Sequence, residues 1–142
     1  DLQGITPDLI FINDPCDEYN LSFMLDPAFF SKKLKSCTQQ LIYIPWFVTS
    51  EIDLEDKEDG KAIVNAENYV VMPAPVHSDY VILQSEGIAK LYQSFLEKES
   101  GAEFANYWKE KLLPFGSPLF DKDKDKEKYA SKAIWEKLKA YQ

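Results

Sequence analysis

Residues 79–86 read Asp-Tyr-Val-Ile-Leu-Gln-Ser-Glu (DYVILQSE), an apolar run that ends in small polar residues just before a helical pattern begins. Such a run predicts a buried strand, and Ser85 is a favoured N-cap for the helix that follows. Residues 111–121 (KLLPFGSPLFD) show the same pattern, with Gly116 and Ser117 after an apolar run. Alternation of strands with helices is typical of a parallel α/β sheet.

Similar apolar runs bounded by polar or turn residues predict strands at residues 8–13, 40–45, 81–83 and 112–115. Helices are predicted over residues 27–36, from Ser85 to a stop at Gly101, and over residues 102–110. Between residues 64 and 76 the pattern is ambiguous, and one option is a helix capped by Asn65 that ends before Pro73. The fold class predicted is a Rossmann-like three-layer α/β sandwich, whose mainly parallel sheet of about four strands is flanked by helices.

Two charged stretches interrupt this pattern. Residues 51–61 are strongly acidic and are expected to form a solvated insertion, because their spacing lacks the ligand pattern of a calcium loop. Residues 121–128 (DKDKDKEK) read as a linker, and Ile134, Leu138 and Tyr141 predict an apolar stripe on a C-terminal helix. We therefore expect residues 1–142 to be one α/β domain, with 121–142 as a linker and a helix that packs on the sheet or has lost its partner.

The charge balance excludes two classes of partner. The net charge is −8, and all 16 positive side chains are lysines. Nucleic acids and anionic membrane surfaces both require a cationic face, so neither is an expected partner. Without arginine the chain also lacks the bidentate fork that usually clamps a phosphate. No apolar run is long enough to predict a transmembrane segment.

The N-terminal sequence and the two cysteines indicate the kind of protein and its compartment. The chain does not begin with Met, carries no signal pattern, and its first predicted strand starts at residue 8. We expect an excised part of a longer cytoplasmic protein, which reaches the inner face of a membrane, if at all, through other parts. Cys16 and Cys37 are expected to be reduced and partly buried, and a single histidine makes a zinc site improbable.

The carboxyl ends of parallel strands meet at one edge of a sheet, where α/β proteins bind their ligands. Backbone amides and helix N-termini at such an edge suit a phosphate or a sugar hydroxyl. For Ser85 a plain capping role is favoured, and for Gly116 and Asp14 a turn. The candidate substrate-binding residues at this rim are Asn13, Asp14, Trp46, Ser85, Glu86, Gly116 and Ser117.

No catalytic residue is assigned, and no metal or cofactor is expected. His77 precedes Ser78 and Asp79, but residues so close along a chain rarely form a triad, so we expect a surface or loop histidine. A divalent-ion site at Asp14, Asp17 and Glu18 is less favoured than a turn.

The order of several motifs resembles the N-terminal α/β domain of the CDP-glycerol glycerophosphotransferase-like proteins of Gram-positive bacteria. The resemblance covers roughly residues 6–121 and rests on PDLIFIND (7–14), FFSKKLKSC (29–37), LIYIPWFV (41–48), SDYVILQSE (78–86) and LPFGSPLFD (113–121). It implies two facing Rossmann-like domains that build teichoic-acid-type polymers of the cell envelope. The C-terminal domain would hold most of the nucleotide donor, and the N-terminal one would handle the acceptor.

Two departures from that family affect the expected activity. Better-known members carry a His-Gly pair after the second strand, where this chain has Pro45-Trp46-Phe47. The family's Gly-x-Pro-Arg-x-Asp turn is present with Leu119 in place of the arginine. We therefore expect an acceptor-side domain that is inactive alone. The implied partners are a missing C-terminal nucleotide-binding domain, a nucleotide-activated glycerol or sugar donor, and a polymer acceptor.

Two other functions remain open. The missing His and Arg also suit a degenerate domain that serves as a non-catalytic interaction or scaffold module. A response-regulator receiver is the third option, with Asp14 as the phosphate-accepting residue. It is disfavoured because no acidic pair precedes residue 8 and Ser117 stands where a receiver has lysine.

Overall fold

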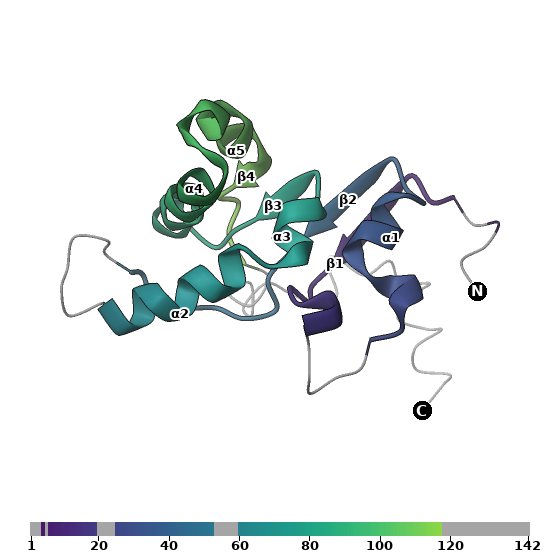
Figure 1. The fold of residues 1–142 in the computed structure, drawn as a ribbon, viewed down its shortest axis with the longest axis horizontal. Coiled ribbons are helices and arrows are strands. Elements are labelled where there is room, and N and C mark those ends of the chain that lie inside the picture. Colours follow the sequence, from purple (N-terminus) through teal and green to yellow (C-terminus); the bar gives the residue numbers. More distant parts are fainter. Residues whose placement is uncertain (1–3, 5, 20–24, 53–59, 118–142) are drawn as a thin grey trace, which may run out of the picture.

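The structure is a computed structural model and describes residues 4, 6–19, 25–52 and 60–117. Its sheet has the strand order β1-β2-β3-β4, and all three neighbouring pairs are parallel (Figure 1). The strands are β1 (Leu9–Ile12), β2 (Gln40–Tyr43), β3 (Tyr80–Ile82) and β4 (Leu112–Leu113). The expected class, a Rossmann-like α/β fold with a parallel four-stranded sheet, is confirmed, and the described helices form one helical layer of the predicted three-layer sandwich. The predicted linker and C-terminal helix of residues 121–142 and most of the acidic stretch lie outside the described residues.

Helices connect successive strands. They are α1 (Ser31–Lys35), α2 (Gly60–Val70), α3 (Pro73–His77), α4 (Glu86–Ser100) and α5 (Ala105–Lys111), with short 3-10 turns η1 (Asp17–Tyr19), η2 (Pro27–Phe29) and η4 (Ala102–Phe104). When parallel strands follow in sequential order, right-handed crossovers all run over the same side of the sheet. The contacts agree, since α1 packs on α3, α2 on α4 and α4 on α5. None of these helices is long and apolar enough to cross a membrane.

The hydrophobic core lies between the sheet and this helical layer. Side chains alternate between the two faces of a strand, and the face toward the helices is the buried one. Leu41, Tyr43 and Val81 are fully buried there. Tyr43 and Val81 share one core cluster with the apolar stripe predicted for α4 and one side chain of α5: Ile88, Leu91, Tyr92, Phe95, Leu96 and Trp108.

The opposite side of the sheet has a different environment. It carries Leu9, Phe11, Ile42, Tyr80, Ile82 and Leu113, which alternate with the buried residues, and Phe115 continues the row. Phe11 is 57% exposed and Phe115 is 75% exposed. We call this surface the open face, because the described helices pack on the other side.

Several helix boundaries match the sequence patterns. The Ser85 hydroxyl accepts a hydrogen bond from the Ile88 amide, so Ser85 caps α4. Gly101 ends α4 with φ near 105°, a value that favours glycine. Asp26 caps η2 through the Ala28 amide. The predicted helix over residues 102–110 is present as η4 followed by α5.

Other boundaries correct the sequence predictions. The helix expected over residues 27–36 is interrupted at Phe30, whose backbone is extended. Asn65 lies inside α2 and does not cap it. Pro73 does not merely end a helix, since it begins α3, where its missing N–H costs nothing. Cys16 and Cys37 are free and half-buried, as expected.

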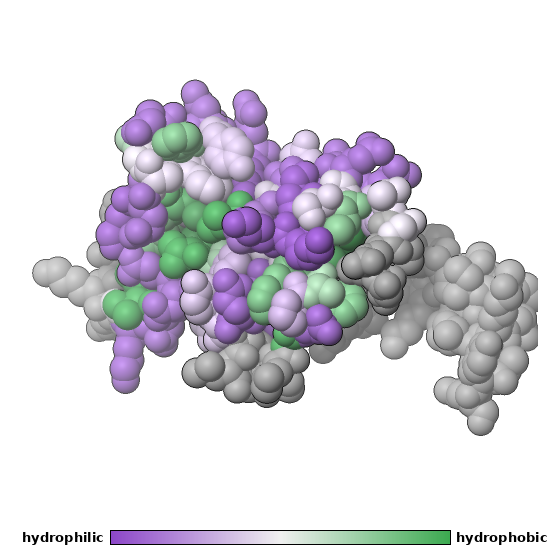
Figure 2. Space-filling view, turned by 45° about the vertical axis from the view of Figure 1, so that its right-hand side comes forward, coloured by the Kyte–Doolittle hydropathy of each residue, from purple (hydrophilic) through white to green (hydrophobic). Residues whose placement is uncertain are grey.

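Most of the outer surface on the side seen in Figure 2 is hydrophilic, and apolar residues show through between the charged ones in separate patches. Separate apolar residues of this kind are ordinary on a folded domain. The continuous apolar row of the open face is the exception.

Replacing Tyr43 by phenylalanine is expected to stabilise the fold by about 1 kcal/mol. A buried hydroxyl without a hydrogen bond loses its hydration on folding, and phenylalanine has no hydroxyl to dehydrate. The Tyr43 hydroxyl is buried, and no hydrogen-bond partner for it lies within the described part of the chain. Burial also raises the pKa of this phenol above its ordinary value. Urea unfolding would measure the change, with exposed Tyr19→Phe as the neutral control. A clear loss of stability in Tyr43→Phe would contradict this account.

Candidate functional site

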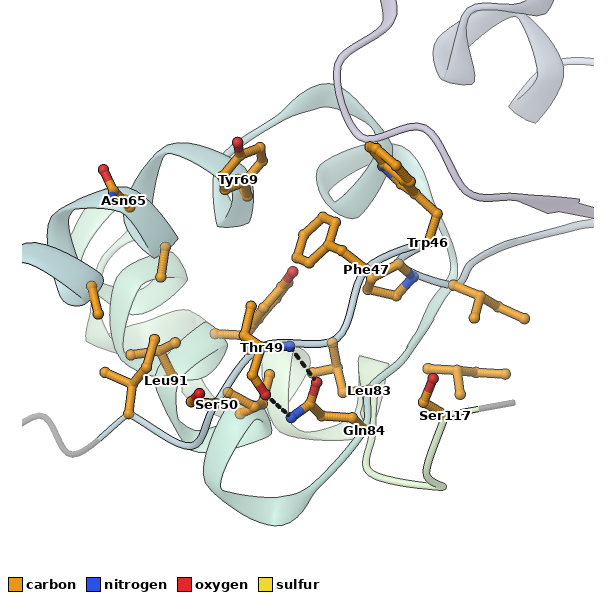
Figure 3. Close-up of a pocket in the computed structure, with 18 of the residues that line it drawn as sticks. Trp46, Phe47, Thr49, Ser50, Asn65, Tyr69, Leu83, Gln84, Leu91 and Ser117 are labelled. Carbon is orange, nitrogen blue, oxygen red and sulfur yellow. Dashed lines mark hydrogen bonds between the residues drawn. The ribbon is translucent and has the colours of Figure 1, made fainter. Parts of the chain in front are cut away.

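A cavity of about 530 Å³ lies at the carboxyl edge of the sheet (Figure 3). Its walls are the segment that follows β2 (residues 44–52), one side of α2, the first turns of α4, and the turn after β4. This edge is where open α/β sheets bind ligands, because the strand ends and helix starts gather there. The convergence that the sequence predicts is therefore present.

Aromatic side chains form one side of the cavity. Trp46 and Phe47 pack edge to face with ring centroids 6.2 Å apart, and the centroid of Tyr69 lies 5.2 Å from that of Phe47. Figure 3 shows the three rings next to one another above the cavity. Trp46 is 64% exposed, so it stands at the rim with its ring available to a ligand.

The loop that carries these aromatics is tied to the end of β3. The Gln84 side chain accepts a hydrogen bond from the Thr49 amide (3.0 Å) and donates one to the Thr49 carbonyl (2.7 Å). One amide side chain thus satisfies both polar groups of a loop residue, in the manner of a strand partner (Figure 3). This pair fixes the position of the loop over the cavity.

No side chain among the residues that line this cavity carries a charge. The polar groups are hydroxyls and amides from Thr49, Ser50, Asn65, Tyr69, Gln84, Tyr92 and Ser117. Burial raises the pKa of Tyr92, so its hydroxyl stays protonated at neutral pH. The lining can therefore donate and accept hydrogen bonds, but it offers no cation for a phosphate and no ready proton acceptor.

A second hollow of about 510 Å³ adjoins the first and shares Ile44, Pro45, Trp46 and Ser117 with it. Asn13 and Phe11, from the end of β1, line its other side. Trp46 stands between the two spaces, so a ligand longer than one ring can contact both.

The structure brings some of the sequence-predicted rim residues together. Trp46, Gly116 and Ser117 line the cavity, and Asn13 lines the adjoining hollow. Gly116 has φ near 101° and open space around its Cα, which supports a turn and not a close approach of backbone. Its amide donates to the Leu83 carbonyl, so the turn also extends the ladder between β3 and β4.

The other predicted rim residues do not line either space. The Asp14 carboxylate accepts a hydrogen bond from the Cys16 amide (2.9 Å), which makes the turn expected before Pro15. The Ser85 hydroxyl is used in capping α4, and Glu86 lies in the first turn of that helix. No group of three His, Cys, Asp or Glu side chains that could hold a metal occurs among the described residues.

The N-terminus of α4 is occupied by an acidic side chain of the chain itself. The Glu51 carboxylate lies directly against Gly87, so a Cβ at this position would push the flexible end of Glu51 aside. Together with Glu86 it places negative charge where the helix dipole favours an anion. A phosphate at this helix would have to displace Glu51, so the structure does not favour a phosphate site there and agrees with the capping role favoured for Ser85.

His77 has partners that the sequence did not indicate. It ends α3 and is half-buried, so it is not a loop histidine, and its Nδ1 lies 2.7 Å from Ser31 Oγ. The Asp17 carboxylate accepts hydrogen bonds from the Ser31 amide (2.8 Å) and hydroxyl (2.5 Å). Serine therefore stands between aspartate and histidine, which is not the order of a catalytic triad. Burial raises the pKa of Asp17 despite these hydrogen bonds.

Sequence reasoning missed Phe47, Thr49 and the inner side of α2 as parts of the site. The Trp46-Phe47 pair was a usable signal, because two adjacent aromatics in the loop directly after a strand often mark a binding surface. The role of Gln84 depends on a contact with a residue 35 positions away, which no local pattern reveals.

No protein-family model matches the chain, and neither a curated protein nor a solved structure matches it. The chemistry of the cavity is therefore the main guide to what the chain does.

Proposed function

We propose that this chain is a ligand-binding α/β domain on the acceptor side of a two-domain transferase. In this proposal it belongs to a glycerophosphotransferase- or glycosyltransferase-like cytoplasmic protein of cell-envelope polymer synthesis. It holds the uncharged part of the acceptor in the cavity at the carboxyl edge of the sheet. It does not catalyse transfer by itself.

The uncharged, aromatic lining of the cavity is the observation that carries this proposal. Apolar walls with a few placed hydroxyls and amides are the usual chemistry of a small-molecule site. Sugar rings and apolar chains pack on such walls, whereas a nucleoside diphosphate favours cations, and no lining side chain is charged. In this proposal the nucleotide donor is therefore bound by the second domain that the resemblance implies.

The lack of a proton-transfer group supports a binding role. The lining hydroxyls belong to Ser, Thr and Tyr, and no base among the lining residues activates them. His77 is hydrogen-bonded in the Asp17–Ser31 network and is not among the residues of the cavity. Acid or base catalysis would need a residue from another domain.

An interaction or scaffold module is the second candidate, and the apolar open face is the observation that favours it. The receiver alternative gains no support. In a receiver the strand order is 2-1-3-4-5. If Asp14 were the phosphate-accepting residue, β1, β2 and β3 would be the last three strands of that order, and the sheet would end at β3. Here β4 extends the sheet beyond β3, and the Asp14 carboxylate is part of a turn.

Binding is expected to follow ligand charge. Titration of the chain with octyl glucoside below its micelle concentration, followed by tryptophan fluorescence, should give saturable binding. Cytidine should bind at least as well as CDP-glycerol, because no lining residue carries a positive charge that would bind the diphosphate. Trp46→Ala should weaken octyl glucoside binding about tenfold, the loss typical of one aromatic contact.

Phe104→Ala is the matched control, because Phe104 is an exposed aromatic on η4, outside the cavity. It should leave the affinity unchanged. Tight binding of CDP-glycerol together with no binding of neutral probes would overturn the proposed chemistry of the cavity. Turnover of CDP-glycerol by the chain alone would overturn the non-catalytic role.

A further inference from the structure

The two outer strands of the sheet, β1 and β4, differ in how their edges are protected (Figure 1). β4 has two residues and is followed at once by Pro114, which has no amide to donate. β1 has four residues, Leu9–Ile12, and none of them is a proline or carries a charge. Short length, proline and charge are the usual means of preventing a further strand from pairing with an edge. The sequence of β1 has none of them.

The register of β1 and β2 shows which backbone groups of β1 point away from the sheet. Leu9 is paired with Gln40, and the Gln40 amide donates to the Asp8 carbonyl (3.0 Å). Because backbone groups alternate in direction along a strand, the amides and carbonyls of Leu9 and Phe11 point outward. Within the described part of the chain, none of these outward groups has a hydrogen-bond partner.

We propose that a second copy of the chain pairs with this edge, so that β1 of each copy lies antiparallel to β1 of the other about a two-fold axis. Two-fold dimers are the commonest oligomers of soluble proteins, and in them the same surface serves both copies. The outward groups define the register. Leu9 of one copy and Phe11 of the other exchange hydrogen bonds, and Ile10 lies opposite Ile10 of the second copy at the axis.

The side chains suit this register. Leu9 is 41% exposed and Phe11 is 57% exposed, and the two would contact each other across the axis as apolar cross-strand pairs. Asp8 would stand opposite Ile12, so no acidic side chain of the ladder faces another one. Because Phe11 also lines the second hollow, the partner's Leu9 would lie beside the candidate ligand site.

The net charge of −8 on each copy opposes association over longer distances, and this predicts a dependence on salt. Exposed charges farther apart than about 8 Å are largely screened at physiological ionic strength. Dimerisation should therefore strengthen as the salt concentration rises from about 20 mM to about 500 mM. A ladder of four residues makes a small interface, so the dimer should be weak and should depend on protein concentration.

Sedimentation equilibrium of the full 142-residue chain measures this association. The mass should rise from 16.4 kDa toward twice that value as the protein concentration increases to about 0.5 mM. Phe11→Lys places a charge on the edge and should keep the chain monomeric. Phe115→Lys is the matched control, because it makes the same change of charge at an exposed aromatic of the same face, beyond β4, and it should dimerise like the unchanged chain.

Two results of this experiment would overturn the proposal. One is a mass of 16.4 kDa at every concentration of the unchanged chain. The other is an equal loss of dimer in Phe11→Lys and Phe115→Lys, which would mean that the copies meet through the open face and not through the edge of β1.

A disulfide test measures the register itself. The two copies of residue 10 would form a non-hydrogen-bonded antiparallel pair, with Cα atoms about 4.5 Å apart. A disulfide spans this distance, so Ile10→Cys should give a covalent dimer on mild oxidation. Ile12→Cys, on the same side of the strand but away from the axis, should give none. The unchanged chain controls for Cys16 and Cys37, and equal cross-linking of the two cysteine variants would contradict the proposed pairing.

Discussion

Replacing Leu41 by alanine is expected to lower the free energy of unfolding by about 3 kcal/mol, within the range found for buried leucines. Leu41 is 0% exposed and lies on β2, whose neighbours β1 and β3 hold it on both sides. Its amide also donates to the carboxylate of Asp79 (2.7 Å), the residue just before β3, so this hydrogen bond ties the backbone of β2 to the start of β3. A strand held this firmly cannot move inward to fill the cavity that alanine leaves. Urea unfolding would measure the change.

Gln40→Ala is the matched control for this prediction. Gln40 precedes Leu41 on the same strand, but its side chain points to the opposite face and is exposed. It should change stability by less than about 0.5 kcal/mol, as surface substitutions usually do. Equal losses in the two variants would mean that the helical layer does not cover the face to which we assign it.

The sheet could be predicted from the sequence because its determinants are local. Each strand is an apolar run bounded by polar or turn residues, and the run at residues 79–86 ends in a capping serine. The apolar spacing of α4 and the glycine at its end are equally local. Once four such strands alternate with helices, the known preference for parallel pairing and right-handed crossovers supplies the rest.

The interruption at Phe30 could not be predicted, because its cause is distant in sequence. The sequence of residues 27–36 suits one continuous helix. Asp17, 14 positions earlier, instead accepts hydrogen bonds from the amide and hydroxyl of Ser31, and so caps a new helix at that point. Tertiary contacts of this kind override local propensity.

The candidate site was half predictable for the same reason. Residues that directly follow a strand, such as Trp46 and Ser117, had to come to the carboxyl edge once the sheet was parallel. The contacts of Gln84 with Thr49 and of Glu51 with Gly87 depend on how the segment after β2 folds back. Its length and charge do not encode that path.

Replacing Lys111 by methionine is expected to remove a rise in stability at alkaline pH. Lys111 is only 2% exposed, and its Nζ donates to the Val76 carbonyl (2.7 Å) and lies 5.0 Å from the ring centre of Trp108. Burial lowers the pKa of this lysine from 10.5 to about 8, although the carboxylate of Asp79 opposes the shift. The ammonium is therefore less favourable in the folded chain than in the unfolded one.

The direction of this pH dependence is set by the number of protons that the folded and unfolded chains hold. Below pH 8 both states hold the proton, and above the unfolded pKa of 10.5 neither does. Between these values the unfolded chain keeps a proton that the folded chain has lost, so stability increases with pH. A shift of this size corresponds to about 3 kcal/mol across the interval. The raised pKa of Cys16 acts in the opposite direction, but it is common to both chains and cancels in their difference.

Urea unfolding of the unchanged chain and of Lys111→Met, repeated from pH 7 to pH 10.5, would measure that difference. The gap between the two curves should move in favour of the unchanged chain as the pH rises, by up to about 3 kcal/mol. Lys109→Met removes a lysine from the exposed side of the same helix. Its free energy of unfolding should change with pH in the same way as that of the unchanged chain. Parallel curves for Lys111→Met would show that Lys111 reaches solvent when charged, and that α5 does not seal it against Trp108 and the end of α3.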